Sequence, residues 1–120
     1  MYTKLEESTE NVLGYSLGEQ ITKQEFRELS NSLEQAIDET GRIRLLLDLD
    51  RLKGVHPGAV LEHLKFTLRR AGKIERMAVV GNRTWEKWWP DIHHCFAKAE
   101  LKHFGEAELQ DAWSWLRGLH

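Results

Sequence analysis

The sequence lacks the features that several classes of protein require. Its single cysteine, Cys95, cannot form an internal disulfide and has no CxxC partner for zinc or redox chemistry. No apolar run approaches the roughly 20 residues of a membrane-spanning helix. The first ten residues, MYTKLEESTE, have neither the basic nor the apolar region of a signal peptide. These absences predict a soluble cytoplasmic protein in which Cys95 is a buried or half-buried thiol.

Motifs of catalysis and cofactor binding are also missing. The chain has no GxGxxG, P-loop, GxSxG or HExxH pattern. Adjacent His93 and His94 would point about 100° apart on a helix, and no acidic residue stands at a metal-ligand offset from them. We therefore expect no enzymatic activity, no cofactor and no metal site. The other histidines are spread along the chain: His56, His63, His103 and His120.

The charge is small overall but unevenly distributed. The net charge of −2 argues against a general nucleic-acid binder. Residues 1–40 carry −6, residues 41–76 carry +5 and residues 77–120 carry −1. The cations of the middle third lie near a predicted helix end, where they either offset the helix dipole or attract an anionic lipid headgroup or an acidic partner. Of the nine cations in this third, the five near the helix end are Lys65, Arg69, Arg70, Lys73 and Arg76.

The apolar pattern predicts one α/β domain spanning residues 1–120. Residues 43–49 form a nearly continuous apolar run between turn formers, which is typical of a strand buried on both faces of a sheet. We expect this strand to be central. The remaining predicted elements are an edge hairpin (residues 1–6 and 12–17), a helix from the capping box of Thr22 and Glu25 to Gly41, a helix over 59–71, strands at 77–80 and 101–104, and a closing helix over 108–119.

The loop that follows the central strand is the first candidate site, because ligands of open α/β sheets usually bind at the carboxyl ends of strands. Asp48 and Asp50 share one face of the strand, and the sequence leaves open whether they cap the loop or bind Arg51. Phe66, in the helix after the loop, falls off the apolar stripe, so we expect it to be exposed or to form a dimer contact. The candidate loop residues are Asp50, Arg51, His56, Pro57 and Gly58.

An aromatic stripe is the second candidate site. Thr84 can begin a helix in which Trp85, Trp88, Trp89, Ile92 and Phe96 fall on one face, with Pro90 as a kink or a restart. Such a stripe either covers the sheet as ordinary core or lies on a membrane or over an apolar ligand, because tryptophan favours the boundary between water and lipid. The sequence leaves both explanations open.

Several segments together resemble the SpoIIAA-like family of small bacterial proteins. They are the hairpin, the strand LLLDLD, the helix start GNRTWEKWW and the end FGEAELQDAWSWL, which carries Phe104, Glu106, Glu108, Ala112, Trp113, Trp115 and Leu116. The resemblance implies a STAS-like fold, a mixed sheet of about five strands flanked by about four helices. It also implies a relation in shape to the CRAL-TRIO lipid-binding domains.

One departure from the STAS pattern bears on function. Anti-sigma-factor antagonists of that class carry a phosphorylatable serine in a DSSG-like turn, whereas this chain has Val55, His56, Pro57 and Gly58 there. We therefore expect a non-catalytic domain that binds an apolar or lipid-like ligand or a membrane surface, peripheral to the inner face of the membrane. The alternative is a STAS-type protein-interaction regulator, and a homodimer is compatible with either function.

Overall fold

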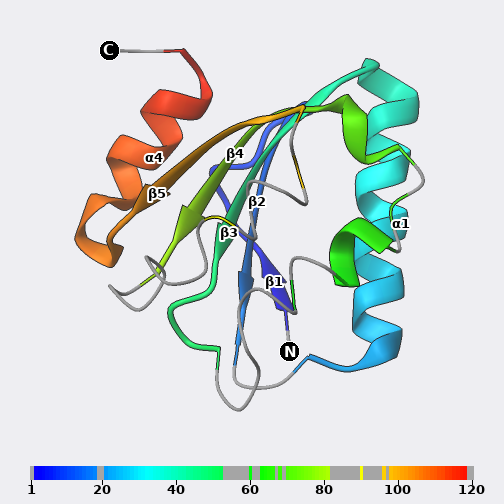
Figure 1. Ribbon diagram of the computed structural model, residues 1–120, viewed down its shortest axis with the longest axis horizontal. Coiled ribbons are helices and arrows are strands. Elements are labelled where there is room, and N and C mark those ends of the chain that lie inside the picture. The colour runs from blue at the N-terminus through cyan, green and yellow to red at the C-terminus, as the bar shows by residue number, and fades with distance from the viewer. Residues whose placement is uncertain are drawn as a thin grey trace.

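The computed structural model describes residues 2–18, 21–52, 60, 63–66, 68, 70–81, 90, 96 and 98–118. Its sheet has five strands in the order β1-β2-β3-β4-β5, with β1 antiparallel to β2 and all the other neighbours parallel (Figure 1). The predicted mixed sheet with a central strand is thus confirmed. The elements are β1 (Tyr2–Lys4), β2 (Val12–Leu17), α1 (Lys23–Thr40), β3 (Ile43–Asp48), the 3-10 turn η1 (Ala71–Lys73), β4 (Ile74–Val80), β5 (Glu100–Phe104), the 3-10 turn η3 (Glu106–Glu108) and α4 (Leu109–Leu116).

Helix α1 begins and ends as predicted. The Thr22 hydroxyl accepts the N–H of Glu25 at 3.1 Å, and the Glu25 carboxylate accepts the N–H of Thr22 at 3.1 Å, which forms the capping box. Gly41 ends the helix with φ of 88° and donates its N–H to the Ile37 carbonyl at 2.7 Å. A positive φ of this kind favours glycine. Both boundaries are therefore fixed by local chemistry.

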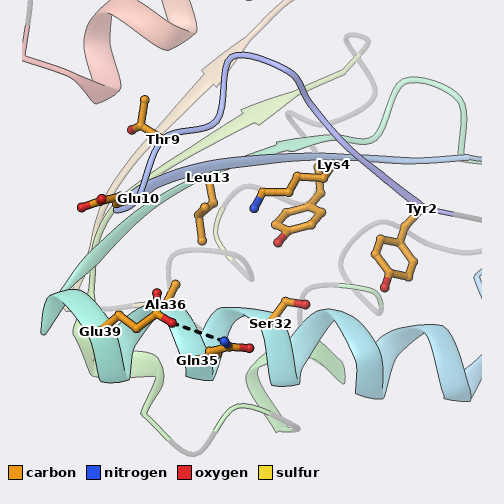
Figure 2. Close-up of a pocket in the computed structure, with 10 residues that line it drawn as sticks. Tyr2, Lys4, Thr9, Glu10, Leu13, Ser32, Gln35, Ala36 and Glu39 are labelled. Carbon is orange, nitrogen blue, oxygen red and sulfur yellow. Dashed lines mark hydrogen bonds between the residues drawn. The ribbon is translucent and has the colours of Figure 1, made fainter.

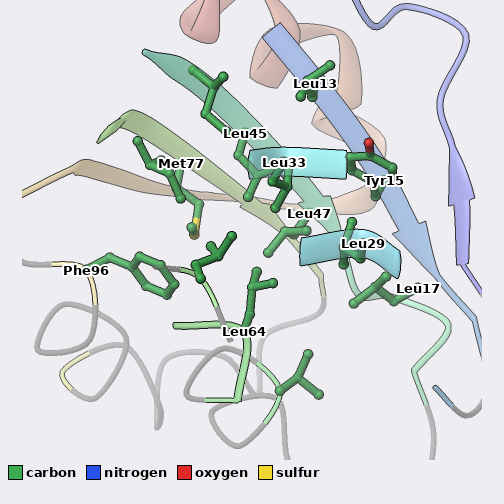
Figure 3. Packing of buried hydrophobic residues seen from close by; sticks show 14 of the residues in the cluster. Leu13, Tyr15, Leu17, Leu29, Leu33, Leu45, Leu47, Leu64, Met77 and Phe96 are labelled. Atoms are coloured by element: carbon green, nitrogen blue, oxygen red, sulfur yellow. The ribbon is translucent and has the colours of Figure 1, made fainter. Parts of the chain in front are cut away.

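The sheet is covered on both faces, and α1 and α4 lie on opposite sides of it (Figure 1). On β3, Leu45 and Leu47 pack toward α1, whereas Leu46 belongs to the core beneath α4. Successive side chains of a strand point to opposite faces, so one strand supplies both cores. Figure 3 shows the α1-side core, in which Leu64 and Phe96 meet the sheet residues.

The segment between β3 and β4 differs in part from its predicted structure. Residues 60 and 63–66 are helical, but η1 occupies the predicted end of that helix and β4 begins at Ile74 instead of at residue 77. The polar pair Glu75 and Arg76 concealed the start of the strand. A register shift beside Ile43 leaves Glu75 as the extra residue, and such a bulge breaks the two-residue alternation on which the sequence prediction relied.

Two side chains near this segment sharpen earlier expectations. Phe66 is 87% exposed, which confirms the prediction that it lies off the apolar stripe. His63 is half-buried, and its ring packs edge-on against Phe26 with 4.6 Å between the ring centroids. His63 therefore joins the 63–66 helix to α1 instead of standing free on the surface.

Helix α4 is held to the sheet in two ways, by the packing of Trp113 and by hydrogen bonds at the C-terminus of the helix. The Trp113 ring lies so close to Gly14 of β2 that a Cβ there would come within 2.4 Å of Trp113 Cη2. At the C-terminus of the helix, Arg76 donates to the carbonyl of Trp115 at 2.7 Å, and Arg44 donates to the carbonyl of Leu116. These bonds satisfy carbonyls that a helix end leaves without a partner, and they turn Arg76 away from the other predicted cations.

Candidate functional site

The carboxyl ends of β3 and β5 bring together three acidic residues, Asp48, Asp50 and Glu106, which we call the acidic edge. Asp48 is 8% exposed, and its Oδ1 accepts the N–H of Asp50 at 3.1 Å. This bond shows that Asp48 caps the loop, which was one of the two alternatives that the sequence left open. Glu106 stands at the start of η3, two residues after the end of β5, and therefore at the same edge of the sheet as Asp48.

Glu106 lies close enough to Asp48 for their two carboxyl groups to interact. The pKa of Glu106 is raised above its ordinary value, first because partial burial disfavours its charge and then because Asp48 and Asp50 are negative. Arg51 lowers the pKa of Glu106 by a smaller effect. The carboxyl groups of the acidic edge therefore act mainly on one another.

The structure describes only two of the five loop residues that were predicted to form a site after the central strand. Asp50 and Arg51 are described and exposed, whereas His56, Pro57 and Gly58 lie outside the described residues. Nearby, His103 Nε2 lies 3.2 Å from the Gly81 carbonyl oxygen, so this histidine helps to join the ends of β4 and β5. Within the described part of the chain, no group of three His, Cys, Asp or Glu side chains is arranged to hold a metal ion.

The aromatic stripe is mostly beyond the described residues. Trp85, Trp88, Trp89 and Ile92 all fall there, so their predicted role stays a prediction. Phe96 is described, is 3% exposed and packs in the α1-side core. Its position is the one expected if at least this end of the stripe covers the sheet.

The predicted cations have separate positions. Lys65 and Lys73 are exposed, and Arg69 lies outside the described residues. Arg70 is occupied, because its backbone N–H and its Nε donate to the Glu34 carboxylate at 3.0 and 2.9 Å, and its guanidinium lies 2.7 Å from Asp38 Oδ1. Glu34 is therefore buried beside Arg70, at 8% exposed, although it is a charged residue of α1.

A cavity of about 450 Å³ lies at the amino edge of the sheet, opposite the acidic edge, and we call it the basic cleft. It is lined by Arg42, Arg70, Gly72, Lys73 and Lys98. Arg42 directly precedes β3, Lys73 directly precedes β4, and Lys98 stands two residues before β5. Sequence reasoning missed Arg42 and Lys98. A signal existed, since the amino ends of parallel strands meet at one edge and a cation stands within two residues before each of β3, β4 and β5.

A second cavity, of about 390 Å³, lies between the β1–β2 hairpin and α1 (Figure 2). Leu13 and Ala36 contribute apolar surface, while Lys4 and Glu39 bring opposite charges. The pKa of Tyr15, also in this lining, is raised by burial. The polar lining of this cavity suits a small hydrophilic molecule better than a lipid tail. The full lining is Tyr2, Lys4, Thr9, Glu10, Leu13, Tyr15, Ser32, Gln35, Ala36 and Glu39.

Comparisons with known proteins agree with this architecture. A similar solved structure is described as an uncharacterized protein from the DUF3478 family with a SpoIIAA-like fold, from Shewanella loihica PV-4. The two sequences are 25% identical, the match covers 96% of this chain and 93% of that chain, and the TM-score is 0.68. No curated protein matches the sequence significantly. The SpoIIAA-like family model matches residues 12–117, from β2 to the turn after α4, and the chain therefore belongs to the SpoIIAA-like family.

Proposed function

We propose that this SpoIIAA-like domain is a non-catalytic, cytoplasmic protein that associates peripherally with an anionic membrane surface. The observation that carries the proposal is the 87% exposure of Phe66, the large hydrophobic side chain that the described residues leave in solvent. Lys65, beside it, is also exposed. An exposed aromatic next to a cation is the pairing that interfacial membrane contacts use.

The magnitudes indicate that Phe66 would not act alone. Burying one such side chain is worth about 1.5–3 kcal/mol, and each lysine or arginine near an anionic surface adds about 1 kcal/mol. Stable peripheral binding usually needs two signals. The tryptophan stripe predicted from sequence would supply the second apolar contact, and the exposed cations would supply attraction to headgroups.

An enclosed apolar ligand is less well supported than a surface contact. The two cavities described above are lined largely by polar or basic side chains, so a lipid tail would require a cavity made by the tryptophan segment. Among the described residues, no helix combines the length and apolar character needed to cross a membrane. We therefore favour a surface contact.

Vesicle flotation tests the proposal. Wild type should float with vesicles containing phosphatidylglycerol and much less with pure phosphatidylcholine, while Phe66→Ser should lower the bound fraction and the matched control Phe66→Trp should keep it. The Trp88→Ser, Trp89→Ser double variant, with its fold checked by circular dichroism, asks whether the stripe takes part. If wild type does not float, or if Phe66→Ser floats as well as wild type, the Phe66 contact is wrong.

A second candidate is a protein-interaction regulator of the STAS type, favoured by the exposure of Asp50 and Arg51 at the carboxyl edge of the central strand. It predicts a stoichiometric partner in a pull-down that is lost with Arg51→Ala and His56→Ala. A homodimer through Phe66 predicts a concentration-dependent sedimentation coefficient that Phe66→Ser abolishes.

A further inference from the structure

Three cations converge at the amino edge of the sheet from three separate segments. Arg42, Lys73 and Lys98 line the basic cleft, although they are far apart in the chain. The parallel pairing of β3, β4 and β5 is what brings them together. Convergence from three segments distinguishes this cleft from a run of lysines on one exposed helix, which is usually only a solvated face.

The charge of the basic cleft is not balanced within the described residues. Arg70 is paired with two carboxylates, those of Glu34 and Asp38, so this group carries one negative charge in excess. The side chains of Arg42, Lys73 and Lys98 are exposed, and their charged groups take part in none of the ion pairs or hydrogen bonds of the described part of the chain. The C-terminus of α1, which ends beside Arg42, contributes only about half a negative charge. Together with the excess carboxylate beside Arg70, this offsets about one and a half of the three positive charges, so the cleft keeps a net positive charge among the described residues.

Two further features make the cleft suitable for a ligand. Arg70 is held by backbone and side-chain bonds to Glu34, so this part of the wall is fixed before a ligand arrives. Gly72 has no side chain to fill the space, and a Cβ there would only touch Lys98 Cδ at 3.5 Å. The volume of about 450 Å³ falls within the roughly 300–1,000 Å³ of small-molecule sites.

We propose that the basic cleft binds the phosphate group of an anionic ligand through Arg42, Lys73 and Lys98. Phosphate oxygens accept charge-assisted hydrogen bonds from both guanidinium and ammonium groups, and several cations around one space suit a phosphate monoester or a diphosphate better than a single carboxylate. The phosphate could belong to a lipid headgroup or to a free phosphorylated molecule. Only the lipid source rests on the proposed membrane function.

Two variants with the same change in charge isolate the cleft. Lys73→Gln, Lys98→Gln removes two cations from it. Lys23→Gln, Arg27→Gln removes two exposed cations from the first turns of α1, which lie about 20 Å or more from the helix end. Both pairs are exposed, so both variants should fold, and circular dichroism checks this. Lys98→Arg keeps the charge and should keep binding.

Isothermal titration with pyrophosphate at low ionic strength is the first experiment, and flotation with phosphatidic acid vesicles is the second. Losing two cations should weaken binding by about tenfold or more in the cleft variant and far less in the control.

Pyrophosphate binding with this pattern supports the cleft and a free ligand. Vesicle binding alone with this pattern supports the cleft and a headgroup. No binding of either probe, or equal loss in both variants, overturns the proposal. Phe66→Ser should not change pyrophosphate binding, so failure of the membrane contact and failure of the cleft are distinguishable.

Discussion

At the amino edge of the sheet, Arg42, Lys73 and Lys98 stand exposed around an open cavity, whereas at the carboxyl edge Asp48, Asp50 and Glu106 interact with one another. The same strands connect the two edges, which are about 20 Å apart for a strand of six residues. Helix α1 runs antiparallel to β3, so its positive end lies toward the acidic edge and its negative end toward the basic cleft. The dipole of α1 therefore complements the sign of the side-chain charge at each edge.

The two edges differ in what their charges do inside the folded protein. At the acidic edge, Asp48 and Asp50 lie close enough to Glu106 to raise its pKa, and this closeness opposes folding once Glu106 is ionised. Cations at the basic cleft are separated and solvated, except for Arg70, which has its carboxylates. The carboxyl groups of the acidic edge thus interact mainly with one another, whereas the cations of the basic cleft remain available to an anionic partner. Substitutions of single acidic residues should therefore have opposite effects at the two edges.

The largest effect should come from Glu34→Ala. This change leaves the N–H and Nε of Arg70 without the acceptors now at 3.0 and 2.9 Å, and loss of such a part-buried partner should lower the free energy of unfolding by about 1–3 kcal/mol. Urea denaturation measures it. Asp38→Ala is the matched control, because Asp38 is largely exposed and its ion pair should contribute at most about 1 kcal/mol. Equal effects of the two changes would contradict a special role for Glu34.

Glu106→Gln should have a smaller effect of opposite sign. Because the pKa of Glu106 is raised from its ordinary value of 4.5, the folded protein binds this proton more tightly than the unfolded chain does. Wild type therefore loses stability relative to Glu106→Gln as the pH rises above 4.5, and the two should converge at lower pH. Thermal melts from pH 4 to 8 test this, with Glu108→Gln as a control of equal charge change that should bring no such gain.

Reversing one charge at the basic cleft should raise stability slightly. Lys98→Glu replaces repulsion among cations with attraction, and for exposed groups this is worth about 0.5 kcal/mol or less at low salt. The gain should vanish in about 0.5 M salt because the charges are then screened. A melting temperature that falls at low salt would show that the cations of the cleft do not repel one another.

The smallest effect should be a local one at the acidic edge. Asp48→Asn keeps an oxygen that can accept the N–H of Asp50 but removes one of the charges that raise the pKa of Glu106. That pKa should move down toward 4.5, measured by carbon-13 NMR of the Glu106 carboxyl. An unchanged pKa would mean that the charge of Asp48 does not contribute to the shift.

The fold also shows which features could be predicted from the sequence and which could not. The capping box at Thr22, the end at Gly41 and the apolar run of β3 were predictable because their signals lie within a few residues of one another. Glu34 was not, because its partner Arg70 is 36 residues away. The start of β4 was hidden by Glu75 and Arg76, whose polar character is explained by a bulge and by contacts with α4.

The candidate sites divide in the same way. Asp48 and Asp50 drew attention because they follow a conspicuous strand, yet their link to Glu106 depends on the pairing of β3, β4 and β5. Arg42 and Lys98 have no notable neighbours in the sequence, and only strand order brings them to one cleft. A search for cations directly before successive parallel strands would have found them.

Arg44 and Arg76, which donate hydrogen bonds to the C-terminal end of α4, have a consequence for the register of the central strands. Arg44 and Arg76 lie opposite each other on β3 and β4, and their acceptors on α4 are 72 and 39 residues away in the chain. A slip of one residue between the strands would send one guanidinium to the wrong face. The hydrogen bonds of Arg44 and Arg76 to α4 are therefore compatible only with the native register of β3 and β4, so α4 stabilises that register against its alternatives.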